Sequence, residues 1–239
     1  MNPTAKAELV PTGKLRVGVN LGNFLLVNKD PASSAPRGIV PDLAQELGRR
    51  LGAPVELVTF SGAGETADGA QAGAWDVAFI GAEPQRAEQI AFTPAYLEIP
   101  ATYLVPAGSP IRSLAEVDRP GVRIAVSARS AYDLFLSRNL KHAQLVRAEG
   151  IQASFDLFAA QKLDVLAGLL PRLSSDVARL PGARILEGNF TAVQQAVGTP
   201  KARTQGAAWL REFVADIKAA GLVAQLIERH NVKGVNVAP

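Results

Sequence analysis

The sequence predicts an α/β fold of two lobes, each lobe a parallel-rich sheet flanked by helices. Two observations support this prediction. Apolar, strand-like runs alternate with helix-like segments along most of the chain, an order typical of parallel sheets covered on both faces. The alternation stops at residues 109–121 and then restarts, which separates two sets of elements. The predicted lobes are residues 1–105 plus 198–239 and residues 106–197.

The first lobe opens with a strand and a helix. Residues 14–20 (KLRVGVN) first alternate between polar and apolar side chains and then stay apolar, which predicts a strand. Within residues 39–52, Leu43, Leu47 and Leu51 fall on one helical stripe. The lobe continues with strands at 54–60 and 75–81, a short helix at 65–74 between them, and an extended segment at 101–108 that leaves it.

The second lobe repeats the alternation of strands and helices. Its strands are expected at 122–127, 143–148 and 163–170, and its helices at 130–140 and 154–162. Two further helix-like segments, 207–221 and 222–230, close the chain and have no strand to follow them.

Composition and charge exclude several classes of function. The 239 residues are 48% hydrophobic and 20% charged, which is ordinary for a globular protein. The formal charge is +3, but basic residues are interspersed with acids, so we expect no nucleic-acid binding. Without cysteine, the chain has no thiolate metal ligand and no thiol nucleophile. No apolar run approaches the roughly 20 residues of a membrane span, so we expect no stable membrane insertion.

Four stretches, taken in order, are similar to those of one protein family. They are KLRVGVN (14–20), RGIVPDLAQELGRRLG (37–52), QAGAWDVAFIGAEPQRAEQIAFTPAY (71–96) and GVRIAVSARSAYDLFL (121–136). As a set they resemble the type II periplasmic solute-binding proteins, family 3 of the extracellular solute-binding proteins. Members of that family deliver polar amino acids and related small molecules to ABC importers. The resemblance covers about residues 14–235.

The resemblance implies a periplasmic-binding-protein type II fold with a two-stranded hinge, crossed near residues 104–108 and 194–199, and with the closing helices on the first lobe. It implies a monomer, without cofactor or catalytic activity, that captures a small polar ligand between its lobes. The ligand is expected to be carboxylate-bearing or amino-acid-like and to pass to an ABC transporter permease. Such a protein works in the periplasm. Residues 1–14 lack the apolar core of a signal peptide, so we expect that peptide to have been removed.

Arg86 is the strongest candidate for contact with the ligand. It follows a strand that reads as fully buried, and strand ends are where α/β proteins bind ligands. In the amino-acid-binding proteins that this chain resembles, the arginine of the stretch 71–96 binds the ligand's carboxylate. Its planar guanidinium presents paired N–H groups that match the two carboxylate oxygens. The alternative is a solvated loop arginine that pairs with Glu83 or Glu88.

The resemblance places further ligand-binding residues in both lobes. The complete predicted set is Asn20, Asn23, Phe24, Gly81, Glu83, Arg86, Ser130, Leu169 and Gln195. Ser130 serves equally well as a helix N-cap, and Arg129 and Tyr132 flank the same helix start. Leu169 stands where amino-acid binders commonly carry an aspartate for the α-ammonium, which argues against an ordinary α-amino acid as ligand. A ligand cation would need Glu83 as its partner.

Two other functions fit parts of the sequence. Residues 61–70 (SGAGETADGA) resemble a dinucleotide-binding fingerprint, but the helix after the glycines is short and is interrupted by Gly69. An enzyme on the same fold, similar to cyclohexadienyl dehydratase, needs a positioned proton donor or acceptor, for which Glu83 is the obvious candidate. The only histidines, His142 and His230, lie far apart in the sequence, so no metal site is expected.

Overall fold

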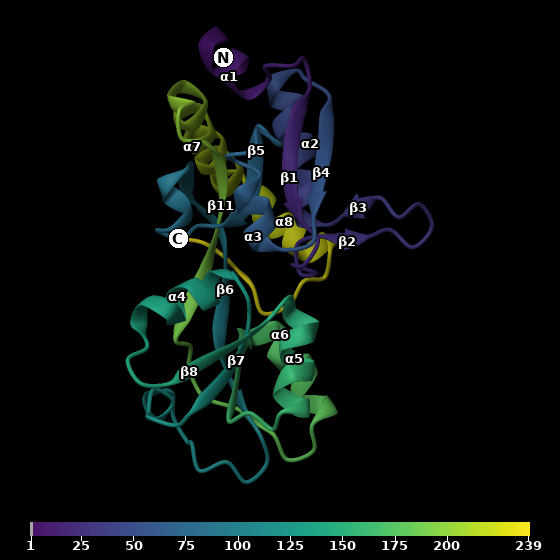
Figure 1. Ribbon diagram of the computed structural model, residues 1–239. Coiled ribbons are helices and arrows are strands. Elements are labelled where there is room, and N and C mark those ends of the chain that lie inside the picture. The colour runs from purple at the N-terminus through teal and green to yellow at the C-terminus, as the bar shows by residue number, and fades with distance from the viewer. Residues whose placement is uncertain (1) are drawn as a thin grey trace. The chain divides into compact units, whose positions relative to one another are not determined.

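The computed structural model describes residues 2–239, which form two compact units (Figure 1). Unit 1 consists of the residues up to Glu98 together with Gln194–Pro239, and unit 2 consists of Ile99–Val193. The chain leaves unit 1 within strand β6 (Ile90–Val105) and returns to it within strand β11 (Thr191–Pro200). The lobe boundaries expected from the sequence, after residue 105 and after residue 197, fall at the end of β6 and within β11, and they stay a prediction.

The sheet of unit 1 has the strand order β4-β1-β5-β11. Strands β1 (Leu15–Asn20), β4 (Val55–Phe60) and β5 (Val77–Gly81) are parallel, and β11 runs antiparallel to β5. Helices α2 (Ile39–Leu51) and α3 (Ala63–Asp68) connect the parallel strands. All five residues of β5 are buried, as expected for a parallel strand that is covered on both faces.

Unit 2 repeats this arrangement with the strand order β8-β7-β9-β6. Strands β7 (Arg123–Ser127), β8 (Gln144–Ala148) and β9 (Val165–Leu169) are parallel, and β6 runs antiparallel to β9. Helices α4 (Ala131–Asn139) and α5 (Ile151–Ala160) connect them, and α5 packs on β7 and β9 in the apolar core. The expected α/β fold with parallel-rich sheets is confirmed in both units.

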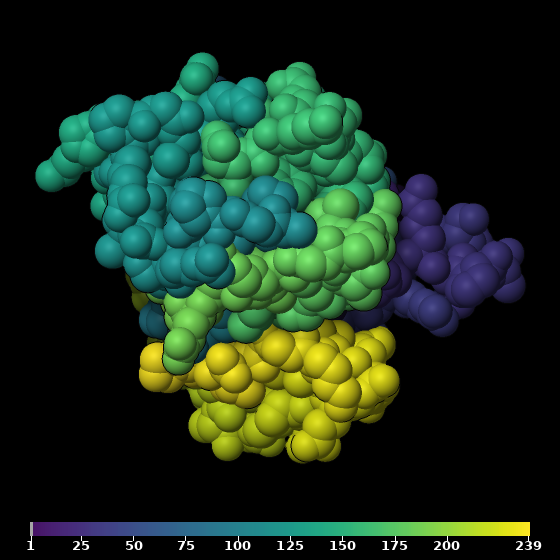
Figure 2. All heavy atoms as spheres, turned by 90° about the horizontal axis from the view of Figure 1, so that it is seen from below, coloured from purple at the N-terminus to yellow at the C-terminus, as the bar shows by residue number. Residues whose placement is uncertain are grey.

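The sequence patterns do not predict several shorter elements. These are α1 (Pro3–Leu9), β2 (Asn28–Lys29), β3 (Pro36–Arg37), α6 (Leu170–Asp176), β10 (Arg184–Ile185), β12 (Asn236–Val237) and three 3-10 turns at Arg86–Glu88, Leu114–Glu116 and Val177–Arg179. Most of them are too short to show a period of apolar residues. The β2–β3 hairpin is largely exposed and projects from unit 1 (Figure 2).

The two closing helices, α7 (Thr204–Ala219) and α8 (Leu222–Arg229), belong to unit 1, where α7 packs on α1 and α8 packs on α2. The Glu8 carboxylate of α1 accepts a hydrogen bond of 2.7 Å from the Gly206 amide in the first turn of α7. The N-cap residue of α7 is Arg203, whose guanidinium cannot accept a hydrogen bond. Helix α1 therefore supplies the acceptor that this helix start lacks.

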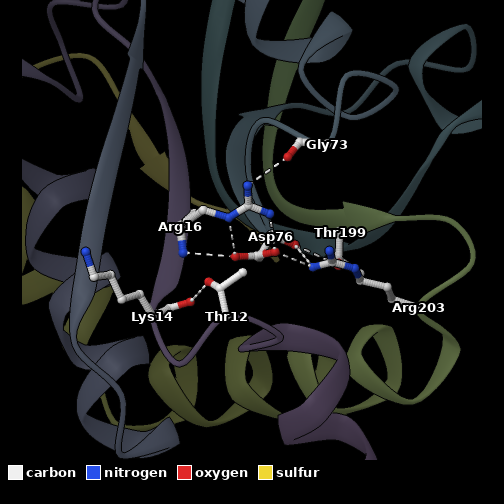
Figure 3. A network of polar contacts seen from close by, with 7 residues as sticks. All are labelled: Thr12, Lys14, Arg16, Gly73, Asp76, Thr199 and Arg203. Carbon is white, nitrogen blue, oxygen red and sulfur yellow. Dashed lines mark hydrogen bonds and ion pairs between the residues drawn. The ribbon is translucent and has the colours of Figure 1, made fainter.

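The Asp76 carboxylate ties several elements of unit 1 together (Figure 3). It is fully buried and accepts hydrogen bonds from the Arg16 amide at 3.1 Å, the Arg16 guanidinium at 3.0 and 2.8 Å, and the Arg203 guanidinium at 2.9 Å. The Asp76 carbonyl accepts another from the Thr199 hydroxyl at 2.9 Å. Arg16 lies in β1, Asp76 directly precedes β5, Thr199 lies in β11 and Arg203 precedes α7. The side chain and the carbonyl of this one residue together therefore join three strands and the start of a helix.

We expect Asp76→Asn to lower the free energy of unfolding by about 3 kcal/mol, the lower end of the scale for breaking a buried ion pair. The side chain keeps its volume, but two guanidinium groups lose their counter-charge; both are partly hydrated, which limits the loss. Chemical denaturation measures the change as a lower midpoint.

The matched control for this variant is Glu56→Gln. It removes an exposed ion pair with Lys14, whose charged atoms are 3.5 Å apart. We expect a change in the free energy of unfolding of less than about 0.5 kcal/mol. Equal losses in the two variants would contradict the role assigned to Asp76.

Candidate functional site

In each unit the strand order marks one pair of strand ends as the expected edge for ligand binding. From β1 the chain passes through α2 to β4 on one side, whereas β5 lies on the other side of β1. Open α/β sheets bind ligands at the carboxyl ends of the strands on either side of such a reversal. In unit 2 the reversal lies between β7 and β9. The selected strand ends are Asn20 and Gly81 in unit 1 and Ser127 and Leu169 in unit 2.

The loop that follows β5 buries Arg86. Its side chain is held by a hydrogen bond of 2.6 Å from Nη1 to the Gly81 carbonyl, and the residue is only 6% exposed. The Ala87 amide donates to the Glu83 carbonyl at 3.0 Å, which closes the turn, and the Glu83 side chain is partly exposed. Arg86 is therefore not solvated, whereas its pairing with Glu83 or Glu88 stays a prediction.

The loop that follows β1 holds the predicted asparagines. The Asn20 side chain accepts a hydrogen bond of 2.9 Å from the Gly22 amide, and the Asn20 carbonyl accepts one from the Asn23 amide at 3.2 Å. Asn23 is 8% exposed, and its buried Oδ1 accepts no hydrogen bond from any residue between 2 and 239. Phe24 is partly exposed and uses its carbonyl to accept a bond from Asn28.

Gln195 reaches the same edge of unit 1 from a different part of the chain. It lies in β11 directly opposite Gly81 and is 5% exposed. Its neighbour Gln194 instead donates from Nε2 to Glu98 at 3.2 Å. Unit 1 therefore gathers the ends of β1 and β5, the buried Arg86 and the buried Gln195 at one edge of its sheet. Contact of any of these residues with a ligand stays a prediction.

In unit 2, Ser130 begins helix α4. Its hydroxyl accepts a hydrogen bond of 3.1 Å from the Asp133 amide, so the N-cap role is confirmed. Asp133 is buried, and its carboxylate accepts hydrogen bonds from the Arg129 amide at 2.8 Å and from the Arg147 guanidinium at 3.0 and 3.1 Å. Leu169 is the last residue of β9, pairs with Ala101 of β6, and is 5% exposed.

The predicted site residues leave out Ser127 and Tyr132, which the structure places beside Ser130. Tyr132 is 3% exposed, and its buried hydroxyl lies beside the Ser130 and Ser127 hydroxyls. Burial raises the pKa of Tyr132 to about 12, and the neighbouring Ser130 and Ser127 hydroxyls act in the opposite direction. The position of Tyr132 two residues after Ser130 was visible in the sequence, but its burial was not.

Neither histidine forms a cluster with other metal-binding side chains. His230 Nε2 lies 2.9 Å from an Asp42 carboxylate oxygen in unit 1, whereas His142 uses its amide to bind Asp118 in unit 2. Over residues 2–239, no three His or acidic side chains gather as a metal site would require. Within the same range, no helix combines the length and the apolar character of a membrane span.

Solved structures of similar fold come from several bacteria. The L-cysteine solute receptor of Neisseria gonorrhoeae is similar at a TM-score of 0.79 and 21% identity, covering 97% of this chain and 95% of that one. An L-arginine-bound substrate-binding protein of an amino acid ABC transporter from Streptococcus pneumoniae gives 0.76 and 20%, over 95% and 97% of the two chains. An ancestral amino acid-binding protein, described as a precursor of cyclohexadienyl dehydratase, gives 0.76 and 21%, over 94% and 98%. Similarity at these identities shows the fold.

No curated protein sequence matches the chain. A family model does, over residues 15–233, a range that includes both sheets apart from β12 and all nine predicted site residues. The chain therefore belongs to the bacterial extracellular solute-binding proteins, family 3.

Proposed function

We propose that this protein binds a small polar ligand through the ligand's carboxylate and delivers it to an ABC transporter. The observation that carries the proposal is the buried Arg86 guanidinium at the carboxyl edge of the unit 1 sheet. Membership of the solute-binding family supports it, and the similar structures from Neisseria gonorrhoeae and Streptococcus pneumoniae concern proteins for L-cysteine and L-arginine.

The surroundings of Arg86 suit a carboxylate. A guanidinium presents parallel N–H groups that match the two oxygens of a carboxylate, and such a pair is stronger where water is excluded. The bond from Arg86 to the Gly81 carbonyl fixes the orientation of the guanidinium plane. Asn20, Asn23, Phe24, Glu83 and Gln195 complete the proposed contacts on unit 1.

Unit 2 is proposed to contribute Ser130 and Leu169. A ligand that contacts residues of both units stabilises the conformation in which both units contact it. A transporter can recognise that conformation. The proposed partner is an ABC transporter permease, and the proposed location is the periplasm, where the protein acts as a monomer without cofactor.

Binding without turnover is the proposed outcome for the ligand. One similar structure is described as a precursor of cyclohexadienyl dehydratase, so dehydration of prephenate or arogenate is the alternative. Acid–base chemistry needs a positioned proton donor or acceptor, which the sequence offers only as Glu83. Incubation with prephenate and arogenate, followed by product analysis, decides between the two: formation of product would establish an enzyme.

The ligand itself is best identified by mass spectrometry of material extracted from freshly purified protein. A thermal-shift screen of amino acids, their des-amino carboxylates and amines complements it, since a ligand that binds the folded state raises the unfolding temperature. Stabilisation by amines alone would contradict the carboxylate proposal.

We expect Arg86→Ala to weaken binding of the best carboxylate from this screen by roughly 2–5 kcal/mol, the usual scale for truncating a buried charge pair. Arg86→Lys should also bind poorly, because an ammonium group lacks the two parallel N–H donors of a guanidinium group. Isothermal titration calorimetry measures both.

The control for Arg86 is Arg211→Ala, which removes an exposed arginine of α7 and should leave affinity unchanged. Ligand-free Arg86→Ala should lose about 1–3 kcal/mol of stability, because the Gly81 carbonyl loses its donor. Affinities are therefore compared well below the unfolding temperature of every variant. Unchanged affinity in Arg86→Ala would refute the proposal.

A second prediction concerns the ligand's amino group. We expect glutarate to bind more tightly than L-glutamate, because the buried Leu169 offers no counter-charge to an α-ammonium group. In Leu169→Asp the preference should shift toward L-glutamate. Calorimetry with the two compounds and both proteins tests this, and submicromolar binding of L-glutamate to the unchanged protein would overturn it.

A further inference from the structure

We propose that the ion pair between Asp133 and Arg147 positions the β7–α4 loop, residues 128–130, so that Arg147 is a positioning residue that controls ligand affinity through Asp133. The loop lies at the expected ligand edge of unit 2 and includes Ser130, a proposed ligand contact. The inference therefore rests on the proposed function and adds a residue of β8, a strand that carries no proposed contact. All groups that carry it belong to unit 2.

The β7–α4 loop contains a backbone conformation that needs support. Arg129 has a φ of 56°, in the left-handed region that residues with a Cβ atom rarely occupy. This conformation turns the chain from the end of β7 into the first turn of α4 and places Ser130 at the N-cap position. Without support from its surroundings the loop would relax to a more common conformation and move Ser130.

The Asp133 carboxylate provides that support. The residue is only 2% exposed, and its Oδ2 accepts a hydrogen bond of 2.8 Å from the Arg129 amide. In return, the Asp133 amide donates to Ser130 Oγ at 3.1 Å. This exchange resembles a capping box, and it fixes both the backbone of Arg129 and the side chain of Ser130.

Arg147 in turn holds the Asp133 carboxylate. Its Nε lies 3.0 and 3.1 Å from the two carboxylate oxygens, and its Nη2 lies 3.0 Å from Oδ1. Nη2 also donates to the Ser137 hydroxyl at 2.8 Å, and the backbone of Arg147 is fixed by the pairing of β8 with β7. A buried carboxylate that loses its counter-charge is costly, so without Arg147 the Asp133 side chain would turn toward water and release Arg129.

A released loop lowers ligand affinity in a defined way. If the loop adopts its binding conformation only part of the time, the apparent dissociation constant rises by the inverse of that fraction. The strain of one left-handed residue corresponds to a factor of about 5 to 30. Arg147 is therefore expected to change affinity without contacting the ligand.

The first experiment compares Arg147→Met with Arg123→Met by titration calorimetry with glutarate. Arg123 is the matched control, because it also pairs with an aspartate of unit 2, Asp164, and its side chain is 43% exposed against 46% for Arg147. Asp164 precedes β9, so the control pair lies at the opposite edge of the sheet. We expect Arg147→Met to weaken glutarate binding about 5- to 30-fold and Arg123→Met to leave it unchanged. Equal losses in the two variants would overturn the inference.

A rescue variant separates positioning from general damage to the fold. Glycine adopts the left-handed conformation without steric cost, so Arg129→Gly gives a loop that needs less support. Adding Arg147→Met to Arg129→Gly should then weaken glutarate binding less than about 3-fold, measured against Arg129→Gly alone. A full loss in the double variant would show that Arg147 acts on the fold as a whole and would contradict the inference.

Hydrogen exchange of the ligand-free protein gives a readout that does not depend on the ligand. The Arg129 amide is protected by its bond to Asp133. In Arg147→Met we expect this amide to exchange at least about 10-fold faster, whereas the Leu166 amide in the middle of β9 keeps its rate. If Arg147→Met does not fold, Arg147→Lys keeps the charge and should show the same changes to a smaller degree, because lysine lacks the paired nitrogens. An unchanged exchange rate at Arg129 would refute the inference.

The outcomes also separate this inference from the proposed function. If Arg86→Ala loses glutarate binding while Arg147→Met keeps it, the positioning inference is wrong and the proposed function stands. If Arg86→Ala binds glutarate as well as the unchanged protein does, the proposed function is wrong, and hydrogen exchange still decides whether Arg147 holds the loop. An unchanged protein that binds no glutarate contradicts both.

Discussion

The buried Asp76 carboxylate is the interaction on which the architecture of unit 1 depends. It lies at the amino end of β5, at the opposite edge of the sheet from Gly81 and Arg86. One edge of the sheet therefore carries a saturated ion pair, with Arg16 and Arg203 as donors, while the other carries the residues proposed to meet the ligand. Because the rigid edge positions β1 and β5, the loops at the far edge can hold polar side chains at fixed places.

Unit 2 contains a similar but weaker ion pair at the start of a strand. Asp164 directly precedes β9, as Asp76 precedes β5, and its carboxylate accepts a hydrogen bond from the Arg123 amide at 2.8 Å. The Asp164 amide returns a bond to the Arg123 carbonyl, and the two charged side chains lie 3.6 Å apart. This pair is substantially exposed and has no counterpart of Arg203, so it fixes strand register more than it adds stability. The two units thus share a pattern of strand order and strand-end pairing.

Sequence patterns predicted the features that depend on neighbouring residues and missed the contacts between residues far apart in the chain. The strands, the stripe of α2 and the N-cap role of Ser130 follow from short-range periodicity and capping chemistry. The place of Arg86 after a buried strand was also legible, but its burial depends on how the following turn folds back on Gly81. No period in the sequence links Asp76 to Arg203, 127 residues away, because their pairing is made by the fold as a whole. The same limit applies to Tyr132, whose burial can be recognised only in the folded chain.

The capping of α7 by Glu8 has a consequence for how the chain reaches its folded state. Glu8 and Gly206 are 198 residues apart, so unit 1 is closed by segments from opposite ends of the chain. Unit 2 is one continuous stretch whose contacts span shorter separations. Closing long loops is entropically costly and slows folding, which favours early assembly of unit 2 and late assembly of unit 1. During synthesis, we therefore expect unit 1 to close only after α7 and α8 have been made.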